Sequence, residues 1–240
     1  MGEGIREHEV YYATLAEQAE RYDEMAEHMR AACMFDQELD AEERNLLAVA
    51  YKQAVGQRRS SWRIVSNTEI SEKAKGNQMT EAKAREYRKK IESELKTHCD
   101  QILALLSERL IPKATSAEAK VSFYKAQGDY NRYIAEISDN VDKTRATNAA
   151  KSSYEDGTRI AEVSLVVTSP FRLGLALNHA VFYYEVMNSP AEAVRIGRKA
   201  FEDAVREIDN LGEEGAKESA LVMQLLRDNL TLWTADNGDM

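Results

Sequence analysis

Apolar residues recur at intervals of three and four positions along most of this chain, most clearly over residues 102–110 and 221–226. That spacing places apolar side chains on one face of an α-helix. The intervening positions are rich in Ala, Leu, Glu, Lys, Arg and Met, which favour helices, and the alternation typical of strands is nearly absent. The pattern therefore predicts an all-α protein of seven to ten helices joined by short loops.

Polar capping residues mark several of the expected helix starts. Ser169 and Ser189 each precede a proline, which is harmless at the first helical position because its missing N–H has no partner there. An acid three residues after a cap, the spacing of a capping box, occurs at Asp40 with Glu43, Thr115 with Glu118, and Ser189 with Glu192. No repeat of fixed period and no linker-like stretch divides the chain into independent domains.

The 240 residues include 32 Lys and Arg against 41 Asp and Glu, a formal net charge of −9. This charge disfavours binding to nucleic acid and to anionic membranes. No apolar run approaches the roughly 20 residues of a membrane span, and the acidic N-terminus does not resemble a signal peptide. Cys33 and Cys99 lack metal-type spacing and fit two reduced thiols. We therefore expect a soluble cytoplasmic protein.

The charge is unevenly distributed along the chain. Residues 1–43 carry 13 acids and three arginines, whereas residues 44–68 carry five basic residues and no acid. Lys52, Arg59 and Arg63 fall at i, i+7 and i+11, which places them on one face of a helix. Stacked cations repel one another unless an anion lies among them. Spacing alone leaves two interpretations open: an anion-binding face, or a solvated face paired with the acidic N-terminal segment.

The chain lacks the motifs of common catalytic and metal sites. Its four histidines are scattered without HExxH, and no GxxxxGK[ST], GxGxxG or GxSxG occurs. Cys99 follows His98 directly, and adjacent side chains on a helix point about 100° apart, which disfavours a thiolate–imidazole pair. We expect a buried structural cysteine here, no cofactor, no metal and no enzymatic activity.

Seven longer strings of the sequence belong together. They are AEQAERYDEM (16–25), EERNLLAVAYK (42–52), YKQAVGQRRSSWR (51–63), AREYRKKIESEL (84–95), GDYNRYIAE (128–136), RLGLALNHAVFYYE (172–185) and LVMQLLRDNLTLW (221–233). They closely resemble the 14-3-3 family, over nearly the whole chain from about Val10 to Trp233. The resemblance implies one all-helical domain over residues 1–233 with a short tail at 234–240. It also implies about nine antiparallel helices in a concave, groove-bearing bundle, and a cup-shaped dimer.

The resemblance implies which residues bind phosphate: Lys52, Arg59, Arg132 and Tyr133. A phosphate monoester carries about −1.5 to −2 charges and three strong acceptor oxygens. Two guanidinium groups can bind these oxygens bidentately, while the lysine adds a compact charge and the phenol one more donor. Without the family, Arg132 alone would be interpreted as part of a surface salt bridge.

The resemblance assigns the bound peptide to a second set of residues. Asn178 and Asn229 match two clamps on the peptide backbone, since an asparagine amide can pair with both N–H and C=O. Spacing alone also allows a helix-packing hydrogen bond for each. The apolar wall of the groove would consist of Leu177, Val181, Leu221, Val222 and Leu225. Glu185 and Trp233 would flank the peptide residues that precede the phosphosite. By themselves the apolar members look like ordinary core.

The dimer interface implied by the resemblance lies on the first helices and on the third and fourth. Its members are Leu15, Ala16, Ser61 and Tyr87, with the salt bridges Arg21–Glu94 and Glu24–Lys90. Such rim pairs contribute about 0–1 kcal/mol each, so apolar burial should dominate the affinity. In relatives, phosphorylation at the position of Ser61 is linked to weaker dimers.

Three features depart from the family pattern. Asn131 replaces an aromatic residue within GDYNRY, and His179 replaces the usual phenylalanine beside Asn178. The tail after Trp233 has seven residues and two acids, whereas relatives usually carry a longer acidic tail proposed to occupy the groove. We expect competition by this tail to be weak.

The resemblance implies a non-enzymatic adaptor that binds phosphoserine or phosphothreonine in extended peptides of client proteins. As a homodimer, or as a heterodimer with a sister isoform, it would bind at two sites and act as a scaffold in signal transduction. Its expected location is the cytoplasm, with shuttling into the nucleus alongside clients. The alternative is a helical scaffold or chaperone-like dimer that binds acidic or amphipathic segments independently of phosphorylation.

Overall fold

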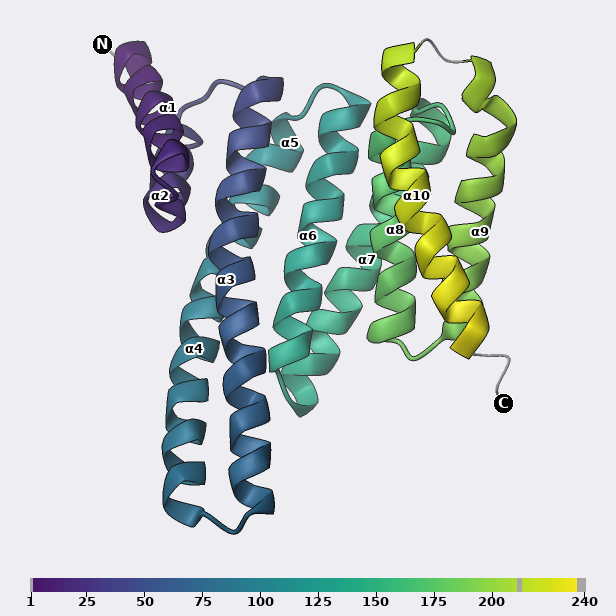
Figure 1. The fold of residues 1–240 in the computed structure, drawn as a ribbon. Coiled ribbons are helices and arrows are strands. Elements are labelled where there is room, and N and C mark those ends of the chain that lie inside the picture. Colours follow the sequence, from purple (N-terminus) through teal and green to yellow (C-terminus); the bar gives the residue numbers. More distant parts are fainter. Residues whose placement is uncertain (1, 211–212, 237–240) are drawn as a thin grey trace. The chain divides into compact units, whose positions relative to one another are not determined.

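The computed structural model describes residues 2–210 and 213–236. Within these ranges it contains nine helices of eleven residues or more and no strand, which confirms the predicted all-α class (Figure 1). The nine are α1 (Gly2–Gln18), α2 (Tyr22–Ala32), α3 (Ala41–Ala74), α4 (Gln78–Leu105), α6 (Ala117–Ile137), α7 (Asn140–Ser164), α8 (Pro170–Glu185), α9 (Pro190–Glu207) and α10 (Glu213–Asp236). A π-helical turn (Leu106–Leu110) and the short α5 (Ile111–Lys113) follow α4, and a 3₁₀ turn (Ile208–Asn210) follows α9.

The helices form two compact units, Met1–Lys113 and Ala114–Met240, and each is described by itself. The assignment of residues 1–233 to a single domain stays a prediction. The expected tail at 234–240 begins inside α10, and its last four residues, 237–240, lie outside the described ranges.

In the first unit, α1 packs on α2, α2 packs on α3, and α3 runs beside α4 as a long antiparallel pair (Figure 1). The predicted capping box at the start of α3 is confirmed. Asp40 Oδ1 accepts from the Glu43 N–H at 2.9 Å, and Glu43 Oε2 accepts from the Asp40 N–H at 3.1 Å. The same Glu43 oxygen accepts from the buried Arg6 Nη2 at 2.6 Å, which ties α1 to the start of α3.

The helices that follow Ser169 and Ser189 begin where the sequence predicts, with each serine as N-cap and a proline in the first turn. The predicted capping box at Ser189 is wrong, because its side chain makes no capping hydrogen bond. Glu192 accepts instead from Arg195 Nε at 2.8 Å. A guanidinium three residues further along the helix offers that carboxylate a charge-assisted bond, which is stronger than one to a neutral backbone N–H.

The cap of α6 also differs from the prediction by one residue. Ser116, rather than Thr115, has the extended backbone of an N-cap, and its hydroxyl accepts from the Ala119 N–H at 3.1 Å. Both residues are good capping types, so the sequence did not distinguish them.

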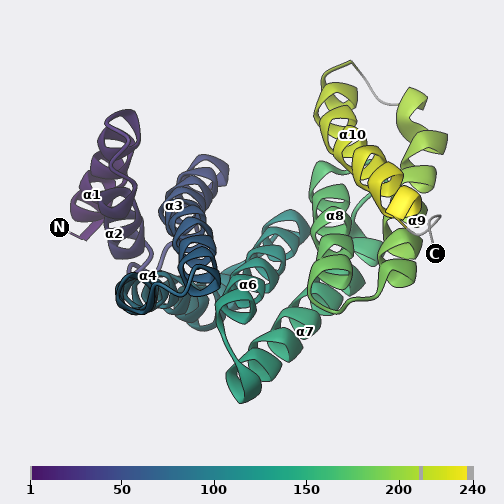
Figure 2. The same cartoon turned by 60° about the horizontal axis from the view of Figure 1, so that its bottom comes forward.

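In the second unit, α8 contacts α6, α7, α9 and α10, and Figure 2 shows α9 and α10 both beside it. Tyr154 of α7 and Phe182 of α8 are fully buried in its core. Gly128 allows α6 to approach α7 closely, because a Cβ at this position would lie 2.6 Å from the Tyr154 ring. This close packing positions the polar residues that follow Gly128 on α6.

Along the described chain, no helix combines the length and the apolar character needed to cross a membrane, and no cluster of three or more His, Cys, Asp or Glu residues could hold a metal ion. Cys33 and Cys99 are buried free thiols. Burial raises the pKa of each thiol to about 12, so both stay protonated and unreactive near neutral pH. Cys99 is therefore the buried structural cysteine that the sequence predicts.

Candidate functional site

The basic residues of α3 lie away from the buried face of the helix. Tyr51 and Ala54 are buried within the first unit, whereas Lys52 is exposed and Arg59 is half-buried. Because residues 44–68 contain no acid, no carboxylate of the same stretch neutralises these cations. Arg58 of the same stretch, however, pairs with Asp23 of the acidic N-terminal segment at 2.8 Å. Anion binding by Lys52 and Arg59 therefore stays a prediction.

A buried carboxylate, that of Asp129 on α6, is the centre of a polar network in the second unit. It accepts from Tyr154 Oη at 2.6 Å and from Asn178 Nδ2 at 2.8 and 2.9 Å. Lys125 Nζ donates to it at 2.9 Å from one helical turn earlier, and Arg132 Nη2 lies 3.6 Å away. Asp129 thereby connects α6 to α7 and α8.

Arg132 is buried next to this network. Its Nε donates to Tyr154 Oη at 3.4 Å, and its Nη1 lies 3.4 Å from Glu185 Oε2. The guanidinium carbon lies 4.8 Å from the centroid of the Tyr133 ring, a cation–π contact. The distances to Asp129 and Glu185 exceed the roughly 2.7–2.9 Å of a good charge-assisted bond, so neither carboxylate forms a close ion pair with Arg132. Anion binding by Arg132 stays a prediction.

The network keeps both of its central groups charged. Burial works against the charge on Arg132, but Tyr154 and Asp129 outweigh it and raise the pKa of Arg132 above its ordinary value. Burial likewise opposes the charge on Asp129, yet Lys125 and Arg132 hold the pKa of Asp129 below its ordinary value. Arg132 is therefore a permanent cation in a partly desolvated place, where a bound anion is screened less than in water.

Asn178 on α8 makes the helix-packing hydrogen bond that its spacing allows. Its Nδ2 donates to both oxygens of Asp129, which fixes the orientation of the amide. Its Oδ1 takes no part in that contact. The role of Asn178 as a clamp on a peptide backbone stays a prediction.

The implied apolar wall is exposed on α10 and half-buried on α8. Leu221 is 68% exposed and Leu225 is 47% exposed, which is unusual for leucine. Val222 and the α8 residues Leu177 and Val181 pack against core clusters of the second unit. The two leucines are therefore available for a further contact, and the other three support them.

Three other residues of α10 lie near this wall. Leu232 is 56% exposed and shares the face of Leu221 and Leu225, since the three fall at i, i+4 and i+11. The sequence analysis did not name it, and it is a further candidate for the apolar wall. Asn229 is half-buried. Trp233 is only 3% exposed and stacks on Tyr184 with ring centroids 5.1 Å apart, so its role beside a peptide stays a prediction.

The charged residues implied for the dimer interface are engaged within the first unit. Arg21 pairs with Glu24, both on or beside α2. Glu94 Oε2 lies 3.4 Å from Arg58 Nε. The expected intersubunit pairs, Arg21–Glu94 and Glu24–Lys90, would have to replace these contacts and stay a prediction.

The other residues implied for the dimer interface differ in exposure. Leu15 and Tyr87 are exposed large apolar residues, as a contact surface requires, while Ala16 is already buried by its own unit. Ser61 is exposed, and its hydroxyl donates to the Gln57 carbonyl at 3.0 Å. Whether these residues meet a second subunit stays a prediction.

His179, the departure beside Asn178, is buried between two aromatic rings. Its ring centroid lies 5.3 Å from that of Tyr154 and 5.2 Å from that of Tyr183. Burial lowers the pKa of His179 to about 4, so the imidazole is neutral near pH 7.

We expect the free energy of unfolding to fall by about 3 kcal/mol as the pH is lowered from 6.5 to 4, owing to His179 alone. In the unfolded chain His179 becomes protonated below its ordinary pKa of 6.5, whereas in the folded chain it stays neutral until about pH 4. Protonation therefore favours the unfolded state between these values, and above pH 6.5 His179 does not lower the free energy of unfolding. Urea titrations at several pH values measure the effect. A His179→Phe variant should show a flatter profile over this range, and the same slope in both proteins would contradict the prediction.

Asp129 and Tyr154 belong to the polar network around Arg132, and the sequence analysis did not name either. One signal was present: Lys125, Asp129 and Arg132 fall at i, i+4 and i+7, the spacing of neighbours on one helix face. No comparable signal points to Tyr154, because it lies on a different helix.

Comparisons with known proteins agree with these observations. The family described as 14-3-3 protein matches residues 12–234. The chain is 53% identical over 226 residues to the 14-3-3 family protein artA of Aspergillus flavus, covering 94% of this chain and 95% of the relative. It is 51% identical over 239 residues to the 14-3-3-like protein GF14-F of Oryza sativa subsp. japonica (99% and 92% covered). It is 53% identical over 232 residues to Protein BMH2 of Saccharomyces cerevisiae (96% and 85% covered). The resemblance is thus confirmed, and the chain belongs to the 14-3-3 family, whose members are non-enzymatic adaptors that bind phosphoserine and phosphothreonine.

Proposed function

We propose that this chain binds the phosphate of a phosphoserine or phosphothreonine peptide with Lys52, Arg59, Arg132 and Tyr133. The observation that carries the proposal is the acid-free basic face of α3. In the second unit Lys125 and Arg132 lie beside the carboxylates of Asp129 and Glu185, so we expect the exposed Lys52 of α3 to supply positive charge that a dianion requires.

The same proposal gives the remaining residues their roles. The amides of Asn178 and Asn229 bind the peptide backbone, and the phosphate fixes its register. The exposed Leu221 and Leu225 contact apolar side chains of the peptide. Glu185 and Trp233 flank the residues before the phosphosite.

We also propose that the protein acts as a homodimer, in which Leu15 and Tyr87 bury apolar surface against a second subunit. Family membership implies dimerisation and phosphorylated clients. Two binding sites in one dimer raise the effective concentration of the second phosphosite of a doubly phosphorylated client. The net charge of −9 disfavours nucleic acid and anionic membranes as partners, and we propose a cytoplasmic location.

A direct test compares one peptide in three forms: phosphoserine, serine and glutamate at the same position. We expect the phosphopeptide to bind roughly 100-fold more tightly than the serine form, because two or more charge-assisted bonds contribute about 1.5–3 kcal/mol each. Isothermal titration calorimetry gives the three dissociation constants. Glutamate binding as tightly as phosphoserine would support the alternative, a scaffold for acidic or amphipathic segments, and would contradict the phosphate site.

A further inference from the structure

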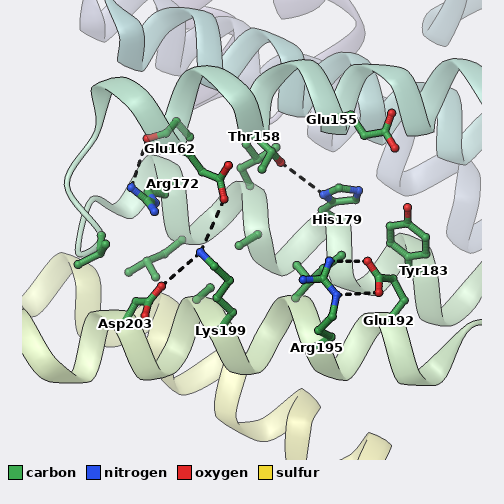
Figure 3. A pocket seen from close by; sticks show the side chains of 17 residues that line it. Glu155, Thr158, Glu162, Arg172, His179, Tyr183, Glu192, Arg195, Lys199 and Asp203 are labelled. Carbon is green, nitrogen blue, oxygen red and sulfur yellow. Dashed lines mark hydrogen bonds and ion pairs between the residues drawn. The ribbon is translucent and has the colours of Figure 1, made fainter.

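A pocket in the second unit lies among α7, α8 and α9 and contains none of the residues proposed to bind phosphate or peptide (Figure 3). Its volume is about 230 Å³. Three alanines, Ala161 on α7, Ala176 on α8 and Ala200 on α9, line it together with Leu175 and Ile196. Short side chains facing one another from three helices leave this space, and the walls that they form are apolar.

His179, which lines one end of the pocket, has a buried hydrogen-bond acceptor without a protein partner. The Thr158 hydroxyl donates to the Tyr154 carbonyl at 2.8 Å, so its oxygen accepts from His179 Nδ1 at 3.4 Å. This hydrogen-bond network assigns the proton of the neutral imidazole to Nδ1, which leaves a lone pair on Nε2. Among the described residues His179 Nε2 is buried and has no partner. Figure 3 shows this nitrogen on the side of the ring away from Thr158, toward Tyr183.

The rim of the pocket is charged, but its cations are already engaged. Lys199 Nζ lies 3.6 Å from Glu162 and 3.4 Å from Asp203 (Figure 3). Arg195 is held by Glu192 through Nε at 2.8 Å. The third cation, Arg172, donates to the Leu165 carbonyl at 2.8 Å. The four acidic side chains of the lining are likewise paired with basic ones, so the pocket offers no unpaired charge of either sign to a ligand. The chemistry favours an uncharged ligand.

We propose that this pocket binds a small uncharged aromatic molecule with one N–H or O–H donor, of the size and chemistry of indole, and that the donor pairs with His179 Nε2. An apolar cavity of about 150 Å³ is large enough for benzene, so the larger volume here suits a fused ring. Satisfying a buried acceptor supplies the specificity, because such a group is costly to leave unpaired. Since Nε2 is closed to solvent, binding includes a small shift of the neighbouring Tyr183 ring.

The test uses indole and 1-methylindole as probes of the full-length protein. The two have nearly the same shape, but only indole has an N–H donor. We expect indole to bind roughly five- to tenfold more tightly, as one hydrogen bond predicts. Calorimetry or ligand-observed NMR measures the affinities, and the imidazole and Tyr183 ring signals should shift on binding. Equal affinities, or no binding of either probe, would overturn the proposal.

Two variants locate the binding site. His179→Phe keeps a ring of similar size and removes the acceptor, so indole should lose its advantage over 1-methylindole. Ala176→Leu fills the pocket and leaves His179 in place, so both probes should bind at least roughly tenfold more weakly. We expect the phosphopeptide affinity to be unchanged in both variants. That result would show that each variant is folded and that this pocket is separate from the proposed phosphate site. Retention of the indole preference in His179→Phe, or of full binding in Ala176→Leu, would refute the assignment.

Discussion

Replacing Asp129 by alanine is expected to lower the free energy of unfolding by about 3–5 kcal/mol, the usual cost of removing one partner from a buried ion pair. The substitution leaves the buried Arg132 with only Glu185, a more exposed carboxylate, beside it. It also leaves the Tyr154 hydroxyl and the Asn178 amide without their acceptor. The Tyr154 and Arg132 side chains are buried, so losing this partner is costly for both.

Chemical denaturation followed by circular dichroism measures this effect. Asp142→Ala is the matched control, because Asp142 is an exposed acid of the same unit whose carboxylate lies 2.9 Å from Arg145. Exposed pairs of this kind contribute at most about 1 kcal/mol. Asp129→Asn, which keeps the shape and one acceptor oxygen, should fall between the two. If Asp129→Ala cost no more than Asp142→Ala, the polar network would not contribute to stability.

Charge reversal at Lys52 is expected to weaken phosphopeptide binding roughly 100-fold or more. The lost charge-assisted bond contributes about 1.5–3 kcal/mol. A carboxylate placed about 4 Å from the phosphate adds repulsion of up to about 4 kcal/mol near a protein surface. Lys52→Gln removes the attraction without adding the repulsion, so its effect should be clearly smaller.

A matched control for charge is available on the same helix. Lys73→Glu makes the same change 21 positions further along α3, which is about 30 Å away and beyond the screening length at physiological salt. Its affinity should stay within roughly twofold of the unmodified protein. Raising the salt concentration should reduce the difference between Lys52→Glu and Lys52→Gln, since repulsion is screened. Equal losses for Lys52→Glu and Lys73→Glu would mean that net charge, rather than a local site, controls binding.

The helical class and many helix starts could be predicted because they depend on neighbours along the chain. The capping box of Asp40 and Glu43 and the prolines after Ser169 and Ser189 are local signals, and each is present in the structure. The basic face of α3 is also local, since two turns of one helix place Lys52 and Arg59 on the same side. The candidate phosphate and peptide residues came from motif resemblance, because spacing alone did not distinguish Arg132 from a surface ion pair.

The partners of these residues depended on how separate helices pack. Ser189 satisfies the sequence rule for a capping box, yet Glu192 pairs with Arg195. Asn178 donates to Asp129, a residue 49 positions away, and nothing in either segment indicates this contact. By itself the sequence determined which stretches are helical and where charge accumulates, since both follow from interactions within a few residues. Only the tertiary structure decided which polar groups meet, because a hydrogen bond requires two atoms within about 3 Å and that distance is set by packing between helices.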